Sequence, residues 1–134
     1  MEKLKVLVVD DDQVLCRTTA RILRQEFDVV AVLGYPQAIR AMGEQHFDAV
    51  LTDYDMGPDG NGVAVAQAAH QQGIPSVLYT ANEEMFNIDS RDEHEFILPV
   101  LHKPSANELI VLAVKEAVRG SNARQTTEAP AATV

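Results

Sequence analysis

Residues 4–12 read LKVLVVDDD, a short apolar run rich in β-branched residues that ends in three carboxylates. Such a run is typical of a buried strand. Residues 13–25 follow with apolar side chains at helical spacing, and Asp11 or Asp12 is well placed to cap a helix there. This stretch therefore predicts a strand, an acidic turn and a helix.

The same alternation of strand and helix patterns continues along the chain. Short apolar runs predict further strands at 29–33, 49–52, 76–80 and 97–102. Apolar residues at helical spacing predict helices at 36–45, 62–72 and 105–119. Strands that alternate with helices at this interval form right-handed βαβ crossovers, which give a parallel sheet covered on both faces. Five such strands predict an α/β domain with a doubly wound parallel sheet.

The length of 134 residues fits one compact domain. Residues 120–134 lack hydrophobic periodicity and are rich in Ala, Thr and Pro. We therefore expect a disordered C-terminal tail after a domain of residues 1–119. Residues 81–96 also have little apolar periodicity, so we expect a fourth helix in this stretch to be short or mobile.

The composition excludes several classes of protein. The net charge is −9 at pH 7, and the sequence has no basic stripe for phosphate contacts, which argues against nucleic acid as a partner. No apolar run approaches the length of a membrane span, so we expect no membrane partner. The single cysteine, Cys16, cannot form an internal disulfide, and the first residues do not resemble a signal peptide. We therefore expect a cytoplasmic protein.

Two clusters of acidic residues directly follow predicted strands, which is where the site of a doubly wound sheet forms. If the first and third strands are neighbours, Asp10, Asp11 and Asp53 converge. Two carboxylates about 4 Å apart repel each other by roughly 4 kcal/mol at an effective dielectric constant near 20. A hard divalent cation would relieve this repulsion, and carboxylate oxygens suit Mg²⁺ or Mn²⁺. The sequence has no His/Cys cluster that would favour zinc.

Two further polar residues, Thr80 and Lys103, stand at the ends of the fourth and fifth predicted strands. Lys103 offers a second positive group and Thr80 a hydroxyl donor. A cation that keeps several waters can also hold a phosphoryl oxygen. Together these residues predict a site that places a phosphoryl group on a carboxylate, with the carboxylate as the nucleophile.

Four short motifs make the chain resemble the receiver domains of two-component response regulators. They are VLVVDDD at the end of the first strand, DAVLTDYDM around Asp53, YTA at 79–81 and the dipeptide Lys103-Pro104. The resemblance covers residues 3 to about 119. It implies a flavodoxin-like fold with strand order 2-1-3-4-5, and a stand-alone receiver similar to the chemotaxis regulator.

The resemblance also implies roles for the acidic residues. Asp53 would accept the phosphoryl group from a histidine kinase or a histidine phosphotransfer protein, forming an aspartyl phosphate in phosphorelay signal transduction. Asp11 and Asp53 would bind Mg²⁺ (or Mn²⁺) directly, together with the backbone carbonyl of Asp55. Asp10 would act on the metal through a bound water.

A second group of matched residues would respond to the phosphoryl group. Thr80 would reorient toward it, the backbone N–H of Ala81 would contact it, and Lys103 would pair with it. Pro104 would follow a cis peptide bond, which an X-Pro bond adopts at low cost. The resemblance thus implies a phosphorylation-controlled switch of a protein-interaction surface.

Two positions would tune the lifetime of the phosphoryl group, and two depart from the family's pattern. Asp55, two residues after the acceptor, and Asn82, two after Thr80, would border the path of the hydrolytic water. Gly57 stands where receivers usually carry Pro, so we expect a loop that is one residue longer. Val100 occupies the position of the usual aromatic switch residue, so we expect output through another surface.

Two other functions compete with this switch. A degenerate receiver would be a phosphorylation-independent docking module, which the altered loop and Val100 keep open. Asp53-Tyr54-Asp55 also fits the D-x-D signature of haloacid-dehalogenase-type phosphatases, but that family places D-x-D on its first strand and not on its third. We therefore expect a switch read by an unknown downstream protein, and not an enzyme that turns over a separate substrate.

Overall fold

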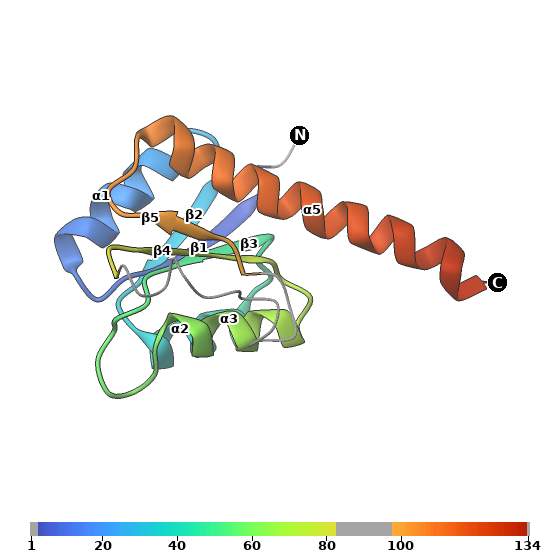
Figure 1. The fold of residues 1–134 in the computed structure, drawn as a ribbon. Coiled ribbons are helices and arrows are strands. Elements are labelled where there is room, and N and C mark those ends of the chain that lie inside the picture. Colours follow the sequence, from blue (N-terminus) through green and yellow to red (C-terminus); the bar gives the residue numbers. More distant parts are fainter. Residues whose placement is uncertain (1–2, 83–97, 134) are drawn as a thin grey trace.

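The structure, a computed structural model, describes residues 3–82 and 98–133, with side chains described as far as residue 122. Five strands form one sheet in the order β2-β1-β3-β4-β5, and every neighbouring pair is parallel (Figure 1). The predicted doubly wound sheet and its strand order are confirmed. The strands are β1 (Lys5–Val9), β2 (Asp28–Val32), β3 (Ala49–Thr52), β4 (Ser76–Thr80) and β5 (Val100–His102).

Helices cover both faces of the sheet. The described helices are α1 (Gln13–Leu23), α2 (Tyr35–Glu44), α3 (Gly62–Gln71) and α5 (Asn107–Thr133). Helices α1 and α5 lie on one face, and α2 and α3 lie on the other (Figure 1). The expected fourth helix within residues 81–96 falls almost entirely outside the described residues.

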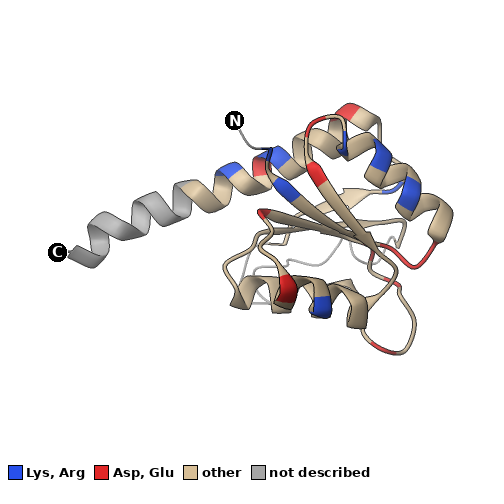
Figure 2. Cartoon of the chain, turned by 180° about the vertical axis from the view of Figure 1, so that it is seen from behind, with Lys and Arg blue, Asp and Glu red and all other residues tan. Residues whose placement is uncertain are grey.

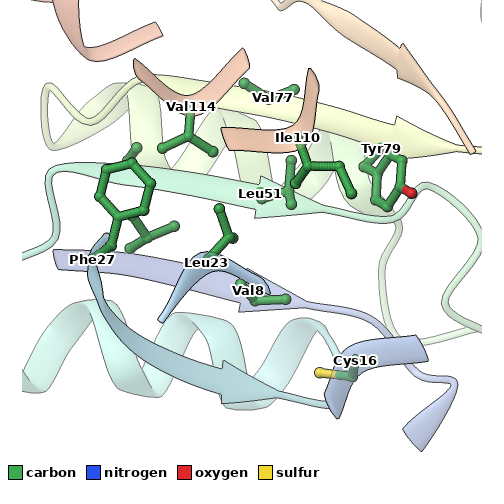
Figure 3. Packing of buried hydrophobic residues seen from close by; sticks show 11 residues of the cluster. Val8, Cys16, Leu23, Phe27, Leu51, Val77, Tyr79, Ile110 and Val114 are labelled. Atoms are coloured by element: carbon green, nitrogen blue, oxygen red, sulfur yellow. The ribbon is translucent and has the colours of Figure 1, made fainter. Parts of the chain in front are cut away.

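Strand β1 shows how the sequence builds both layers. Its side chains alternate between the two faces, because successive residues of a strand point to opposite sides. Val6 and Val8 pack into the cluster formed with α1 and α5. Leu7 and Val9 pack into the cluster formed with α2 and α3. All four are at most 2% exposed, and Figure 3 shows Val8 within the first cluster.

Side-chain caps fix the starts of two helices. Asp12 caps α1, where its Oδ1 accepts hydrogen bonds from the backbone N–H groups of Val14 at 3.0 Å and Leu15 at 3.1 Å. Asn61 caps α3 by accepting from the N–H of Ala64 at 3.0 Å. Of the three consecutive aspartates, only Asp12 serves the helix. Asp10 and Asp11 are left for the site at the end of β1.

The last two elements differ in length from their predictions. Strand β5 spans only Val100–His102, although Pro99 still extends the ladder by accepting a hydrogen bond from Leu78 N–H at 2.8 Å. Helix α5 continues to Thr133, so the expected disordered tail from residue 120 is not what the structure shows. Gly120 lies within the helix and does not end it, and the Ala, Arg, Gln and Glu residues beyond it favour helix. The domain boundary at residue 119 stays a prediction.

Candidate functional site

The ends of β1 and β3 bring two predicted site residues together. The parallel register pairs Val9 with Thr52, so the residues that follow, Asp10 and Asp53, lie at neighbouring strand ends. The pairing extends one step further, because Asp53 N–H donates to the carbonyl of Val9 at 2.9 Å. The backbone of the sheet therefore places these two carboxylates beside each other.

The ends of β4 and β5 add a hydroxyl and an ammonium group to the same edge. The register pairs Thr80 with His102, so Lys103 directly follows the last strand. The backbone N–H of Lys103 donates to the carbonyl of Thr80 at 3.0 Å. Four strand ends thus supply Asp10, Asp53, Thr80 and Lys103 to one edge of the sheet.

The structure gathers three carboxylates at this edge. One oxygen each of Asp10, Asp11 and Asp53 lies within 4.8 Å of the others. Asp10 is 4% exposed, Asp53 is half-buried and Asp11 faces solvent. The backbone fixes two of them, since Asp10 Oδ1 accepts from Asp12 N–H at 3.0 Å and Asp53 Oδ1 accepts from Tyr54 N–H at 2.8 Å. A set of oxygen ligands open to solvent on one side suits a hard divalent cation.

Lys103 lies against two of these carboxylates. Its Nζ is 2.5 Å from Asp10 Oδ2 and 3.9 Å from Asp53 Oδ1. The side chain of Lys103 is only 10% exposed, and those of Asp10 and Asp53 are 5% and 14% exposed. The ammonium also lies 5.4 Å from the centre of the Tyr79 ring. One cation therefore balances a buried carboxylate and stands within reach of a second.

The charges of the site shift the pKa of Asp53. Burial raises the pKa of this carboxyl above its ordinary value, the Lys103 ammonium opposes this shift, and the Asp10 carboxylate adds to it. The ionised form of Asp53 is thus less favoured than in water. A carboxylate in this state gains from any positive charge that approaches its oxygens.

The hydroxyl of Thr80 is part of a network that joins two loops. Thr80 is 1% exposed, and its Oγ1 accepts a hydrogen bond from Asn82 N–H at 3.1 Å. The side-chain amide of Asn82 donates to Asp55 Oδ2 at 3.3 Å. The two predicted tuning residues, 27 positions apart, are therefore in direct contact. Sequence reasoning placed both beside the site but gave no reason to pair them.

Three other predicted positions surround this centre. The peptide bond between Lys103 and Pro104 is cis. Ala81 directly follows Thr80 and faces solvent. Val100 is half-buried and packs against a small cluster of Ala66, Leu78 and Leu98. Val100 therefore packs against its neighbours from within β5, at the position where receivers usually carry an aromatic side chain.

The loop after Asp53 depends on two glycines. Gly57 has a φ of 85°, which proline cannot adopt, so the departure from the family's usual Pro is explained by the path of the backbone. A Cβ on Gly62 would lie 2.1 Å from the carbonyl oxygen of Asp53. Gly62 N–H also donates to Tyr54 O at 2.9 Å, so the start of α3 packs directly onto the backbone of Asp53 and Tyr54. The sequence analysis did not predict this contact.

Tyr79 is a residue of the site that the sequence analysis missed as a functional side chain. Its hydroxyl accepts a hydrogen bond from Ser105 N–H at 3.1 Å, in the turn that follows Lys103 and Pro104. The hydroxyl of Ser105 in turn donates to the carbonyl of His102. Tyr79 thus links β4 to the turn that leads into α5. Its position next to Thr80 in the YTA motif was the available signal.

Comparison with known families agrees with this geometry. A model of the response regulator receiver domain matches residues 6–115. The chain belongs to this family. A receiver domain with a five-stranded parallel sheet and an aspartate cluster at its carboxyl edge fits phosphorelay signalling in two-component systems. Receiver domains bind Mg²⁺ and take part in signalling, and they are not classical enzymes.

Individual relatives support the same family. The DNA-binding response regulator MtrA of Mycolicibacterium paratuberculosis is 35% identical over 86 residues, which cover 63% of this chain and 38% of that protein. The receiver thus matches well under half of the length of that relative. A solved receiver domain protein of the CheY-like type, from Methanospirillum hungatei JF-1, has a TM-score of 0.79 at 19% identity, and the match covers 92% of this chain and 99% of that one.

A third comparison is with part of a larger protein. The N-terminal domain of a response regulator/sensory box/GGDEF protein from Carboxydothermus hydrogenoformans has a TM-score of 0.78 at 25% identity, over 90% of this chain and 98% of that chain. Receivers of different origin therefore share this fold. Within the described part of this receiver, no helix combines the length and the apolar character needed to cross a membrane.

Proposed function

We propose that this receiver accepts a phosphoryl group on Asp53 from a histidine kinase or a histidine phosphotransfer protein. The observation that carries the proposal is the position of Asp53 between two groups of opposite charge. Its carboxylate lies in the cluster with Asp10 and Asp11, and one of its oxygens is 3.9 Å from Lys103 Nζ. An Asp53 oxygen would attack phosphorus, and the bond from phosphorus to the donor's imidazole nitrogen would break.

The aspartate cluster fits Mg²⁺ (or Mn²⁺) by the chemistry of its oxygen ligands and their mutual distance of at most 4.8 Å. Asp11 and Asp53 would hold the cation directly with the carbonyl of Asp55, and Asp10 would hold it through a water. When bound, the cation neutralises negative charge on the phosphoryl oxygens. Asp10 already pairs with Lys103, which supports its indirect role.

The protein's own residues would convert the new charge into a change of shape. Lys103 would shift from Asp10 toward the phosphoryl oxygens, because they carry more negative charge than the Asp53 carboxylate alone. The Thr80 hydroxyl would donate to the same group, together with the N–H of Ala81. Thr80 Oγ1 now accepts a hydrogen bond from Asn82 N–H, so a rotation of the Thr80 side chain toward the phosphoryl group would break this contact and rearrange the turn. This rearrangement is the proposed signal.

Asp55 and Asn82 would set how long the phosphoryl group persists. Asn82 is held at two points, by Thr80 through its backbone and by Asp55 through its side chain. A change in either contact would alter the access of water to the acceptor. The hydrogen bond between the two side chains therefore supports a joint tuning role.

The partners and the location belong to the same proposal. The relatives named MtrA are DNA-binding response regulators, and this chain matches only a part of them. The net charge of −9 supports a downstream partner that is a protein and not a nucleic acid. A phosphodonor kinase and a single cysteine support a cytoplasmic setting.

Intact-mass measurement after incubation with Mg²⁺ and acetyl phosphate tests the phosphoryl acceptor. We expect one labile phosphoryl adduct per chain, absent in Asp53→Asn. Asp59→Asn is the matched control, because Asp59 is an exposed acid in the same loop, and it should keep the adduct. No adduct on the wild type would contradict the proposal in favour of a docking module. Sustained hydrolysis of phosphate esters would contradict it in favour of a phosphatase.

A further inference from the structure

Helices α1 and α5 lie on the same face of the sheet (Figure 1). A groove runs along α5 there, first beside the end of α1 and then beside residues 3–4 and the turn before β2. It consists of two depressions that share the side chains of Glu26 and Lys115, and we call them together the α1–α5 groove. Apolar side chains line both parts of this groove: Ile22, Val111 and Leu112 in the first, and Leu4, Phe27 and Val118 in the second. Leu112 is 48% exposed and Leu4 is 39% exposed, so apolar surface is open to a partner.

An ion pair stands between the two depressions. Lys115 Nζ is 2.5 Å from Glu26 Oε1, and the two side chains are 43% and 45% exposed. Exposed ion pairs contribute little to stability. A carboxylate from another molecule can therefore replace Glu26 on Lys115 with little loss. Glu26 shows where such a carboxylate would sit.

The charge of the groove differs from that of the whole chain. The second depression is lined by three cations, Lys3, Lys115 and Arg119, and by one anion, Glu26. The first is lined by Glu26, Glu108 and Lys115, so the groove as a whole holds three cations and two anions. The whole chain carries a net charge of −9. Figure 2 shows basic positions along α1 and α5. Acidic side chains of a ligand are therefore attracted to the second depression, whereas a second copy of the chain as a whole is repelled.

We propose that the α1–α5 groove binds an acidic amphipathic helix of a partner protein. Apolar side chains one turn apart on that helix would cover Ile22 and Leu112. Carboxylates beside them would pair with Lys115 and Arg119, whose present partners are exposed glutamates. An apolar groove along one side of a helix offers the shape into which a partner helix packs. None of the groove's lining residues belongs to the aspartate cluster, so the groove is a separate site from Asp53.

The test uses a fluorescein-labelled synthetic helix of about 18 residues, or about five turns. Leucines at i, i+3, i+4 and i+7 form its apolar face, and glutamates flank them. Two control peptides carry serine for the leucines or lysine for the glutamates. Fluorescence anisotropy gives the Kd for the full chain, and amide chemical shifts in two-dimensional NMR locate the binding surface. We expect a Kd of about 100 µM or tighter, as for a small interface.

Variants of the receiver separate groove binding from general charge effects. We expect Lys115→Glu to raise the Kd at least about tenfold, because it places a like charge against the peptide's carboxylates. Leu112→Ser should weaken binding by removing apolar contact while leaving the charge unchanged. Arg40→Glu is the matched control, because Arg40 is 82% exposed on α2 and also pairs with a glutamate. It should change the Kd by less than about twofold.

Several results would overturn the proposal. They are equal weakening by Lys115→Glu and Arg40→Glu, shift changes confined to other surfaces, or equal affinity for the serine or lysine peptide. Sedimentation tests the second copy as the occupant. A dimer that Leu112→Ser abolishes, together with no binding of the acidic peptide, would assign the groove to self-association and reject the proposal. Circular dichroism of each variant checks that it is folded.

Discussion

Lys103 and Lys115 each hold a carboxylate at a nitrogen–oxygen distance of 2.5 Å, but in opposite surroundings. The side chains of Lys103 and Asp10 are 10% and 5% exposed, whereas those of Lys115 and Glu26 are 43% and 45% exposed. Distance alone therefore does not rank the two pairs. In the buried pair each charge depends on the other, so a new charge on Asp53 disturbs it. In the exposed pair water can replace either partner.

The largest expected effect comes from breaking the buried pair. Lys103→Ala leaves the carboxylates of Asp10 and Asp53 without their nearby cation. Removing one partner of a buried ion pair typically destabilises a protein by about 3–5 kcal/mol. We expect a loss of this order in urea unfolding at pH 7 with EDTA present. The same variant should bind Mg²⁺ more tightly, because the ammonium no longer competes for the carboxylates. An unchanged unfolding midpoint would show that Lys103 is not needed to balance them.

A steric change in the same region should have the next largest effect. In Gly62→Ala the new Cβ would lie 2.1 Å from the carbonyl oxygen of Asp53, so the loop or α3 has to move. We expect destabilisation by about 1–3 kcal/mol and slower phosphorylation by acetyl phosphate. Gly43→Ala is the control, because no atom lies within 4 Å of a Cβ there and Gly43 is in helix α2. That variant should be as stable as the wild type or slightly more stable.

The pH dependence of stability tests whether the folded protein disfavours the ionised form of Asp53. Because its pKa is raised in the folded state, chiefly by burial, the native protein binds more protons than the unfolded chain between the two pKa values. Stability contributed by this group is present below the unfolded pKa and is lost as pH rises through the folded one. Asp53→Asn should therefore be more stable than the wild type at pH 7 in EDTA. Urea unfolding should show the difference shrinking toward about pH 4. A difference that is constant with pH would contradict this assignment.

The contact between Asp55 and Asn82 should give a smaller effect, seen in a rate. One hydrogen bond of this kind contributes about 1 kcal/mol, or roughly a fivefold change in rate. We expect Asp55→Ala and Asn82→Ala each to change the rate of dephosphorylation, and the double variant to change it by less than the product of the two. Loss of the adduct, followed by intact mass, measures all four proteins. Independent effects that multiply would show that the two residues do not act through their contact.

The exposed pair should show the smallest effect on folding. Lys115→Ala breaks an ion pair whose two side chains are both more than two-fifths exposed. We therefore expect the free energy of unfolding in urea to fall by at most about 1 kcal/mol. Added salt should reduce the loss further. A loss as large as that of Lys103→Ala would contradict the distinction between the two regions.

The edge of the sheet was predictable because the carboxyl ends of parallel strands coincide. Asp10, Asp53, Thr80 and Lys103 end four different strands, and the structure brings them together there. The pattern of short apolar runs indicates where each strand ends. The strand order, which makes β1 and β3 neighbours, was implied by the family resemblance, and the structure confirms both the sheet and its order.

The contacts between loops were not predictable in the same way. The bond from Asn82 to Asp55 and the approach of Gly62 to Asp53 depend on backbone paths outside regular strands. No periodicity reports such paths. The pairing of Lys103 with Asp10 depends on side-chain geometry and burial. The length of α5 was underestimated because residues 120–134 lack the hydrophobic periodicity by which a helix packed on the sheet is predicted.

Helix α5 begins only a few residues after Lys103, and the turn that leads into it is tied to β4 through Ser105 and Tyr79. From this anchored base its 27 residues extend past the end of the sheet (Figure 1). At 1.5 Å per residue the helix is about 40 Å long, so a tilt of about 10° at the base moves its far end by about 7 Å. A displacement of atomic size beside Lys103 that tilted the helix by this angle would therefore move its tip by more than the width of a side chain.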